Sequence, residues 1–279
     1  MATVALWKLS PTANTAVRLE TAGQTLDEVS RGLPNGAYTT FRTFPGNRVM
    51  HFSAHIARLE ETARLVGKAV RLNAAALRET VHTALLAYPT AEKRARITLD
   101  LEQNTGDIFV SVEPLLVPSS RDYLHGVRVI TRQAHRDNPK AKLTSFIQTA
   151  GSIREDIPAG INEVVMLDED GWLLEGLTSN FFAVMDGAVW TAEEGVLSGL
   201  TRSIVLEEIA ASGLKLQRKP AHIADLPDFE EAFLTSASRA VLPVVEIDGK
   251  LVGRGQPGAV TQILLKRYNA RIERETEPV

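Results

Sequence analysis

Cysteine is absent from this chain of 279 residues. Its absence excludes disulfide bonds, a thiol nucleophile and any metal site built from thiolates. No apolar run reaches the roughly 20 residues that span a bilayer. Residues 1–10 contain one lysine but neither a long apolar stretch nor the pattern of a cleavage site. We therefore expect a cytoplasmic protein that has no membrane partner.

An excess of positive charge is also missing. Lysine and arginine number 31 against 34 aspartates and glutamates, a formal net charge of −3. Such a balance gives no basic surface for a nucleic-acid backbone, so nucleic acid is not an expected partner. Hydrophobic residues make up 44% and charged residues 23% of the chain, as in ordinary globular proteins. A chain of this length favours two domains with packed cores.

Several common catalytic signatures are absent from the sequence. It contains no serine in a nucleophile-elbow pattern and no phosphate loop that ends in Gly-Lys-Ser/Thr. His51 and His55 lack the intervening glutamate of a zinc-protease helix, so no metal site is expected. Gly253, Gly255 and Gly258 have the spacing of a dinucleotide-binding loop, but no βαβ unit follows them. We interpret them as turn glycines.

Hydrophobic periodicity predicts an α+β arrangement in the first part of the chain. The expected helices run from an N-cap at Ser53 to Gly67 and from an N-cap at Asn73 to about residue 88. The expected strands are 35–44, 48–52, 95–101 and 108–116.

Short apolar runs bounded by Gly or Asp are typical of barrel strands and dominate the remainder of the chain. These strands are expected at 127–131, 164–167, 172–174, 181–185, 189–190 and 232–234, and helices at 146–155, 201–211 and 258–269. We predict a small α+β domain over 1–118, a linker at 119–122 and a larger, barrel-like domain over 123–279.

Four ordered motifs then point to one family. The chain reads "NPKAKLTSFI" from Asn138 and, further on, "NEVVMLDEDGWLLEGLTSNFFAV". It also contains "GNRVMHFSAHIARLEETARLVG" before these segments, and "LSGLTRSIVLEE" and "EEAFLTSASRAVLPVVEIDG" after them. Over roughly residues 30–260 this order resembles the fold type IV enzymes that use pyridoxal 5'-phosphate. These include branched-chain, D-amino acid and (R)-amine aminotransferases of class IV and aminodeoxychorismate lyases.

The resemblance implies that Lys142 carries the cofactor as a Schiff base. Its neighbours Leu143, Phe146 and Ile147 are apolar, and partial desolvation makes an amine a better nucleophile. Lys140 is the alternative. The family separates this lysine from the glutamate of the "EG" motif by a number of residues in the low thirties, and Lys142 lies 33 positions before Glu175.

The resemblance also implies the other cofactor contacts. Glu175 is expected to bind the pyridine nitrogen, and Arg58 the phosphate. Leu200 and Thr201 open a helix whose free N–H groups favour an anion. A further phosphate contact is expected at Ser236 and Ala237, although Ala237 stands where the family usually has threonine.

Substrate binding is assigned to Tyr38, Arg42, Arg96 and Ser238. Tyr38 and Arg42 fit the family pattern in "GAYTTFRTF", whereas Thr39 replaces a usual acidic residue. Arg96 aligns with a position that helps to bind the substrate carboxylate.

The family resemblance leaves more than one activity open. The leading hypothesis is transamination between an amino acid or primary amine and a 2-oxo acid, through an aldimine on Lys142. The alternative is 4-amino-4-deoxychorismate lyase chemistry, which releases pyruvate, and a binding protein without catalysis is a third hypothesis. The resemblance also implies a homodimer.

Overall fold

The computed structural model describes residues 4–11, 15–103 and 105–279. The chain divides into two compact units. Unit 1 comprises Met1–Leu116, Ala141–Gly151 and Arg274–Val279, and unit 2 comprises Val117–Lys140 and Ser152–Glu273. The expected linker at 119–122 holds the N-cap, Ser119, and the first residues of a short helix, and its role as a linker stays a prediction.

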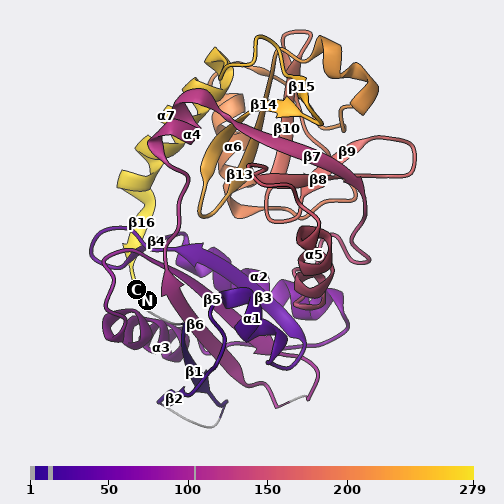
Figure 1. Ribbon diagram of the computed structural model, residues 1–279. Coiled ribbons are helices and arrows are strands. Elements are labelled where there is room, and N and C mark those ends of the chain that lie inside the picture. Colours follow the sequence, from indigo (N-terminus) through magenta and orange to yellow (C-terminus); the bar gives the residue numbers. More distant parts are fainter. Residues whose placement is uncertain (1–3, 12–14, 104) are drawn as a thin grey trace. The chain divides into compact units, whose positions relative to one another are not determined.

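Unit 1 combines antiparallel strands with helices. Its elements, labelled as in Figure 1, are β1 (Ala5–Leu9), β2 (Val17–Leu19), α1 (Leu26–Arg31), β3 (Gly36–Arg42), β4 (Arg48–Met50), α2 (Phe52–Leu65), α3 (Ala74–Ala87), β5 (Lys93–Asp100), β6 (Ile108–Pro114), most of α5 (Ser145–Glu155) and β16 (Thr276–Pro278).

The five-stranded sheet of unit 1 has the order β2-β1-β6-β5-β3 and buries both faces. Side chains alternate between the two faces of a strand. Accordingly Trp7 joins the core that contains α2 and α3, whereas Leu6 packs with Leu26 and Val29 of α1. The position of β3 at the edge of this sheet is important, because one side of its backbone is left to other partners.

Two helix starts were predicted from capping residues. Asn73 is the N-cap of α3, where its side chain accepts a hydrogen bond from the Ala76 N–H, as expected. The expected N-cap of α2 at Ser53 is wrong. The N-cap is His51, whose backbone is left-handed with φ 52°, so the turn from β4 into the helix is tighter than local sequence indicates.

Unit 2 is built around a barrel. Its elements are α4 (Ser120–His125), β7 (Val127–Gln133), β8 (Glu163–Leu167), β9 (Leu173–Gly176), β10 (Asn180–Met185), β11 (Ala188–Trp190), α6 (Leu200–Ala211), β12 (Lys215–Gln217), the 3-10 helix η1 (Ile223–Asp228), β13 (Glu231–Ser236), β14 (Ala240–Ile247), β15 (Lys250–Leu251) and most of α7 (Ala259–Glu275).

Six strands of unit 2 close on themselves. The pairing runs β10-β13-β14-β7-β8-β9 and returns from β9 to β10 through Asn180 and Glu175. Alternate side chains of these strands, among them Val129, Phe181 and Leu234, fill a common core. The predicted α+β fold with a barrel-like second part is therefore confirmed.

Parallel pairing of β7 with β8 determines where the lysine motif lies. Parallel neighbours need a long crossover connection. Here it is the segment 134–162, which carries Lys140, Lys142 and α5, and whose residues 141–151 belong to unit 1. Among the described residues, no helix is both long and apolar enough to cross a membrane.

Candidate functional site

The backbone of Lys142 is fixed along the free edge of β3. The Tyr38 N–H donates to the Lys142 carbonyl at 2.9 Å, and the Lys142 N–H donates to the Thr62 hydroxyl at 3.3 Å. Next to it, Ala37 and Leu143 form an antiparallel bridge. The main chain at Lys142 is therefore held like an extra strand residue, although the sequence suggested only a short segment before a helix.

The Lys142 side chain lies over an aromatic ring. Its Nζ is 4.6 Å from the centroid of the buried Tyr38 ring, a cation–π arrangement. Lys140 belongs to unit 2, where its Nζ donates to the carbonyl of Glu193 and lies 3.9 Å from the Glu194 carboxylate. The two candidate lysines thus have different surroundings, and the assignment of Lys142 to the cofactor stays a prediction.

Arg58 lies one helical turn after His55 on α2. The buried His55 ring shares a hydrogen bond of 2.7 Å with the Thr39 hydroxyl. Burial, together with the positive charges of Arg58, Lys142 and His51, lowers the pKa of His55 to about 3. The imidazole is therefore neutral at neutral pH. Arg58 and Lys142 are thus both close enough for their charges to act on the His55 ring.

Arg96, expected to bind the substrate carboxylate, is buried against α1. Its guanidinium stacks on the Tyr38 ring, with Cζ 4.9 Å from the centroid. Its N–H groups donate to Asp27 at 2.8 Å and to the Leu26 carbonyl, Ser30 and Thr40. In this arrangement Arg96 supports Tyr38 from within unit 1, and its contact with substrate stays a prediction.

Arg42 is half-buried at the other end of β3. Its Nη2 donates to the Glu92 carboxylate at 2.8 Å, and its guanidinium lies 4.7 Å from the centroid of the Phe44 ring. These contacts restrain the side chain, and its proposed role toward substrate is likewise untested.

Glu175 lies near the end of β9 and is buried in unit 2. Its Oε1 is 2.7 Å from Nε of Arg136, and its Oε2 accepts a hydrogen bond of 2.8 Å from Nδ2 of Asn180. Asn180 faces Glu175 across the β9–β10 pairing. Oε2 of Glu175 is thus held by a hydrogen bond from Asn180, and Oε1 lies in charge contact with Arg136.

The helix α6 begins without a side-chain cap. Its N-cap is Gly199, and no acidic residue stands in its first turn. The amides of Leu200 and Thr201 in that turn have no acceptor within the helix. Such a terminus can bind an anion through its N–H groups and the helix dipole. Phosphate binding by Leu200 and Thr201 stays a prediction.

Ser236, Ala237 and Ser238 lie in the turn between β13 and β14. Arg239 closes this turn, since its backbone N–H and its Nε both donate to the Ser236 hydroxyl, at 3.3 and 3.2 Å. The hydroxyl acts as the acceptor in both bonds and keeps its own O–H as a donor. A role in binding phosphate stays a prediction for this turn, as does the assignment of Ser238 to the substrate.

A second buried carboxylate anchors Arg239. Its Nη2 lies 2.7 Å from the Glu163 carboxylate, which also accepts a hydrogen bond of 2.6 Å from Thr178. Burial acts to raise the pKa of Glu163, but Arg239 and Thr178 outweigh it and hold that pKa below the usual value. Glu163 is therefore a structural anion of the barrel that fixes the turn after β13.

Sequence reasoning missed four residues that contact the candidate site residues or fix their surroundings. They are His55, whose ring is affected by the charges of Arg58 and Lys142, and also Arg136, Asn180 and Arg239. His55 and Asn180 stand inside the motifs "HIARL" and "GLTSN", so their neighbourhood was visible. Arg136 and Arg239 contact residues far away along the chain, and no local pattern signals such pairs.

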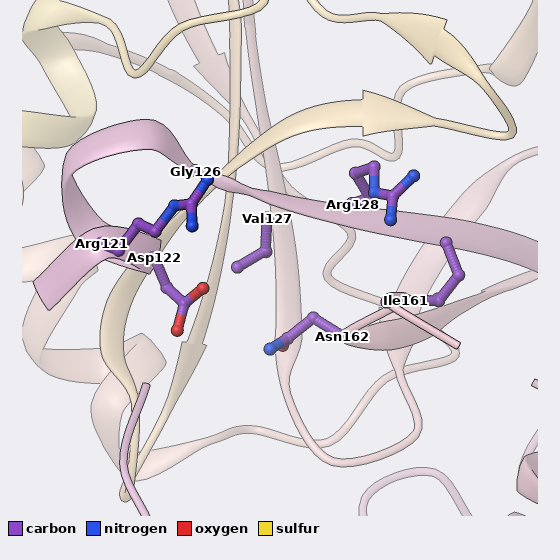
Figure 2. Close-up of a pocket in the computed structure, with 8 residues that line it drawn as sticks. Arg121, Asp122, Gly126, Val127, Arg128, Ile161 and Asn162 are labelled. Atoms are coloured by element: carbon purple, nitrogen blue, oxygen red, sulfur yellow. The ribbon is translucent and has the colours of Figure 1, made fainter. Parts of the chain in front are cut away.

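A cavity of about 440 Å³ lies elsewhere in unit 2 and is shown in Figure 2. It is lined by α4, the start of β7 and the turn before β8, through Arg121, Asp122, Gly126, Val127, Arg128, Gly160, Ile161 and Asn162. None of the predicted site residues lines it. Within the described ranges, moreover, no cluster of three or more His, Cys, Asp or Glu side chains could hold a metal ion.

Comparison with known proteins identifies aminotransferases as relatives of this chain. Residues 36–247 match the family model of class IV aminotransferases. A putative branched-chain-amino-acid aminotransferase of Methanocaldococcus jannaschii is 25% identical over 84% of this chain and 86% of its own. The branched-chain-amino-acid aminotransferase of Pseudomonas aeruginosa is 32% identical, but the match spans only 54% of this chain and 52% of that protein, about half of each.

Solved structures share the fold over the whole chain. The T.th. branched-chain amino acid aminotransferase, solved with pyridoxamine 5'-phosphate, superposes with a TM-score of 0.80 at 22% identity and covers 100% of this chain and 99% of that one. A putative branched-chain amino acid aminotransferase from Thermotoga maritima gives 0.79 at 21% identity and covers 96% of each chain. Class IV aminotransferases use pyridoxal 5'-phosphate as cofactor. Since the family model matches most of the sequence and the fold agrees, the chain belongs to the class IV aminotransferases.

Proposed function

We propose that the protein transfers an amino group between an amino acid or primary amine and a 2-oxo acid, with Lys142 as the catalytic amine. The observation that supports this most strongly is the geometry at Lys142. Its backbone is held on the edge of β3 while its Nζ lies 4.6 Å from the centroid of the Tyr38 ring. A chain segment this constrained presents the amine in one place, which is what a covalent site needs.

The residues of the two units fit pyridoxal 5'-phosphate. In unit 1, Arg58 provides a guanidinium beside a histidine that stays neutral. In unit 2, the uncapped start of α6 offers free N–H groups to the phosphate, and Glu175 offers a buried carboxylate to the N–H of the pyridine ring. We infer that the hydroxyl of Ser236 is a further donor to the phosphate.

Each side chain has a distinct task in this proposal. When bound, the cofactor supplies an aldehyde that condenses with amines and a ring that accepts the electrons of a broken C–H bond. The Lys142 amine acts as nucleophile and then moves the substrate proton as a general base. Glu175 keeps the ring nitrogen protonated, which favours electron withdrawal. The Tyr38 ring contacts both Lys142 and Arg96 and holds the amine in place.

The partners in this proposal are a small-molecule amino donor and a 2-oxo acid acceptor. Tyr38, Arg42, Arg96 and Ser238 are the candidate substrate contacts. The homodimeric state and the cytoplasmic location stay predictions from the sequence, as does the absence of nucleic-acid and membrane partners.

Replacing Lys142 tests the site directly. Borohydride reduction of the holoenzyme, followed by fragmentation mass spectrometry of its peptides, is expected to place the pyridoxyl group on Lys142. The Lys142→Ala variant should lose the label, whereas Lys140→Ala, the matched control two positions away, should keep it. A label found on Lys140 would overturn the assignment.

The reaction class is tested by one half-reaction. Branched-chain L-amino acids, D-alanine, D-glutamate and (R)-1-phenylethylamine are supplied singly to the holoenzyme without an acceptor. A transaminase should stop after about one equivalent of pyridoxamine phosphate per subunit, because the amino group has nowhere to go. The cofactor is then released and measured by chromatography. If every donor fails while aminodeoxychorismate gives pyruvate over many turnovers, the protein is a lyase.

A further inference from the structure

We propose that Arg136 is a positioning residue that keeps Glu175 ionised before the cofactor binds, while Asn180 sets the direction of the carboxylate. The inference rests on the proposed function, in which Glu175 meets the ring nitrogen. It adds that the site holds a preformed anion, so the cofactor does not have to displace a proton from Glu175.

Arg136 and Glu175 form a close, buried ion pair in unit 2. Nε of Arg136 and Oε1 of Glu175 are 2.7 Å apart, and the two side chains are only 4% and 2% exposed. Arg136 is itself anchored, because its Nη2 donates to the Leu177 carbonyl at 3.3 Å. The guanidinium therefore faces Glu175 in a fixed position.

Burial makes this contact decisive for the charge of Glu175. A carboxylate taken out of water without a counter-ion is strongly destabilised and takes up a proton instead. The neighbouring carboxylate, Glu163, comes close to Gly176, where an added Cβ would meet its side chain at 2.9 Å. Glu163 has its own counter-ion in Arg239, at 2.7 Å. Each of the two buried glutamates thus has an arginine 2.7 Å away, Arg136 for Glu175 and Arg239 for Glu163.

Asn180 connects the carboxylate to the start of α6. Its Nδ2 donates to Glu175 and also to the Leu197 carbonyl, each at 2.8 Å. Its Oδ1 lies 2.1 Å from the position where a Cβ on Gly199 would stand. The same amide therefore orients Glu175 and packs against the N-cap of the helix proposed to bind phosphate.

The charge of Glu175 before binding determines how many protons are released when the cofactor binds. In the native protein Glu175 is already ionised, and the complex contains one proton between Glu175 and the ring nitrogen. Without Arg136, cofactor-free Glu175 carries a proton of its own, yet the complex still needs only one. Cofactor binding to such a variant must then release about one proton more than binding to the native protein, by linkage.

Isothermal titration calorimetry of the cofactor-free full chain with pyridoxal 5'-phosphate measures this number. The buffers differ in ionisation enthalpy and contain neither phosphate nor a primary amine. Arg136→Gln should release about one proton more than the native protein, whereas Arg136→Lys, which keeps the charge, should restore the native count. The control is Glu208→Gln, which breaks an ion pair with Arg267 near the other end of α6 and should leave the proton count unchanged. If Arg136→Gln released the same number of protons on cofactor binding as the native protein, the proposal would be overturned.

Two further variants separate this inference from the proposed function. If Glu175→Gln binds the cofactor with native affinity and a native proton count, Glu175 is not at the ring nitrogen and the proposed site fails. If Arg136→Gln does not fold, the double variant Arg136→Gln/Glu175→Gln decides, because it contains no unpaired buried charge. A folded double variant supports the ion-pair role. An unfolded one shows that Arg136 is needed for the fold itself, which contradicts the proposal.

Discussion

His55 is a buried imidazole that the fold keeps neutral. Burial and the charges of Arg58, Lys142 and His51 hold its pKa at about 3, well below the ordinary value of 6.5. Its Nδ1 is occupied by the Thr39 hydroxyl at 2.7 Å, where the family usually has an acidic residue. The pair of His55 and Thr39 is therefore neutral, and it adds no negative charge beside Arg58, the residue proposed to bind phosphate.

This arrangement makes stability depend on pH. The unfolded chain protonates His55 below pH 6.5, whereas the folded chain does not until about pH 3. The stabilisation from neutral His55 is therefore complete above pH 6.5 and is lost as the pH falls, by up to about 1.4 kcal/mol per pH unit. We therefore expect the free energy of unfolding, measured with urea between pH 7 and 5, to fall less steeply with falling pH in His55→Gln than in the native protein.

The matched control for this prediction is His135→Gln. The His135 side chain is 78% exposed, so its replacement should leave the slope of the native protein intact. Equal slopes in the native protein and in His55→Gln would show that His55 is not held neutral.

At the scale of elements, the start of α6 combines two requirements. In the proposed function the first N–H groups of the helix bind phosphate, and the N-cap Gly199 has no side chain that would occupy them. The same position must also admit Asn180, whose Oδ1 occupies the space of a Cβ. Glycine meets both needs although its φ of −61° is one that any residue can adopt. The requirement is therefore one of space and not of backbone conformation.

Gly199→Ala tests this interpretation of α6. The added methyl group should push Asn180 away from Glu175 and move the helix start, because its Cβ would lie 2.1 Å from Oδ1. We expect a loss of about 1–3 kcal/mol in unfolding free energy, the usual cost of overpacking. Cofactor affinity, measured by fluorescence titration, should fall roughly tenfold, about 1.4 kcal/mol.

The control substitution is Gly32→Ala at the C-cap of α1. There φ is −90° and the nearest atom to an added Cβ is 3.5 Å away, so little should change. Native cofactor affinity in Gly199→Ala would mean that the start of α6 does not bind the phosphate.

At the scale of the whole molecule, the chain passes from one unit to the other several times. Residues 141–151, within the crossover from β7 to β8, belong to unit 1, as do the last residues, 274–279. The candidate residues are divided in the same way, with Lys142 and Arg58 in unit 1 and Glu175 and α6 in unit 2.

The oligomeric state is the prediction at this scale. The family resemblance implies a homodimer in which each subunit completes the pocket of the other. Analytical sedimentation of the holoenzyme at assay concentration should therefore give a mass of twice 30.5 kDa. Activity measured across a dilution series should fall as the dimer dissociates. A monomer that retains full activity would contradict the prediction.

The sequence alone determined the family, the α+β class and the position of most helices. The motifs lie in one order along the chain, and hydrophobic periodicity is a local property that a helix such as α3, with its Asn73 cap, follows directly. Short elements that depend on packing, such as α1 and α4, were not predicted, since local propensity over six residues is weak.

Tertiary structure decided the partners of the candidate site. The ion pair of Arg136 with Glu175, the hydrogen bond between His55 and Thr39, and the seat of Lys142 on β3 join residues that are distant in the chain. The left-handed backbone at His51 likewise arises where β4 turns into α2. Sequence patterns report the propensity of neighbouring residues, whereas the charge state and direction of a buried side chain depend on which distant groups the fold brings into contact with it.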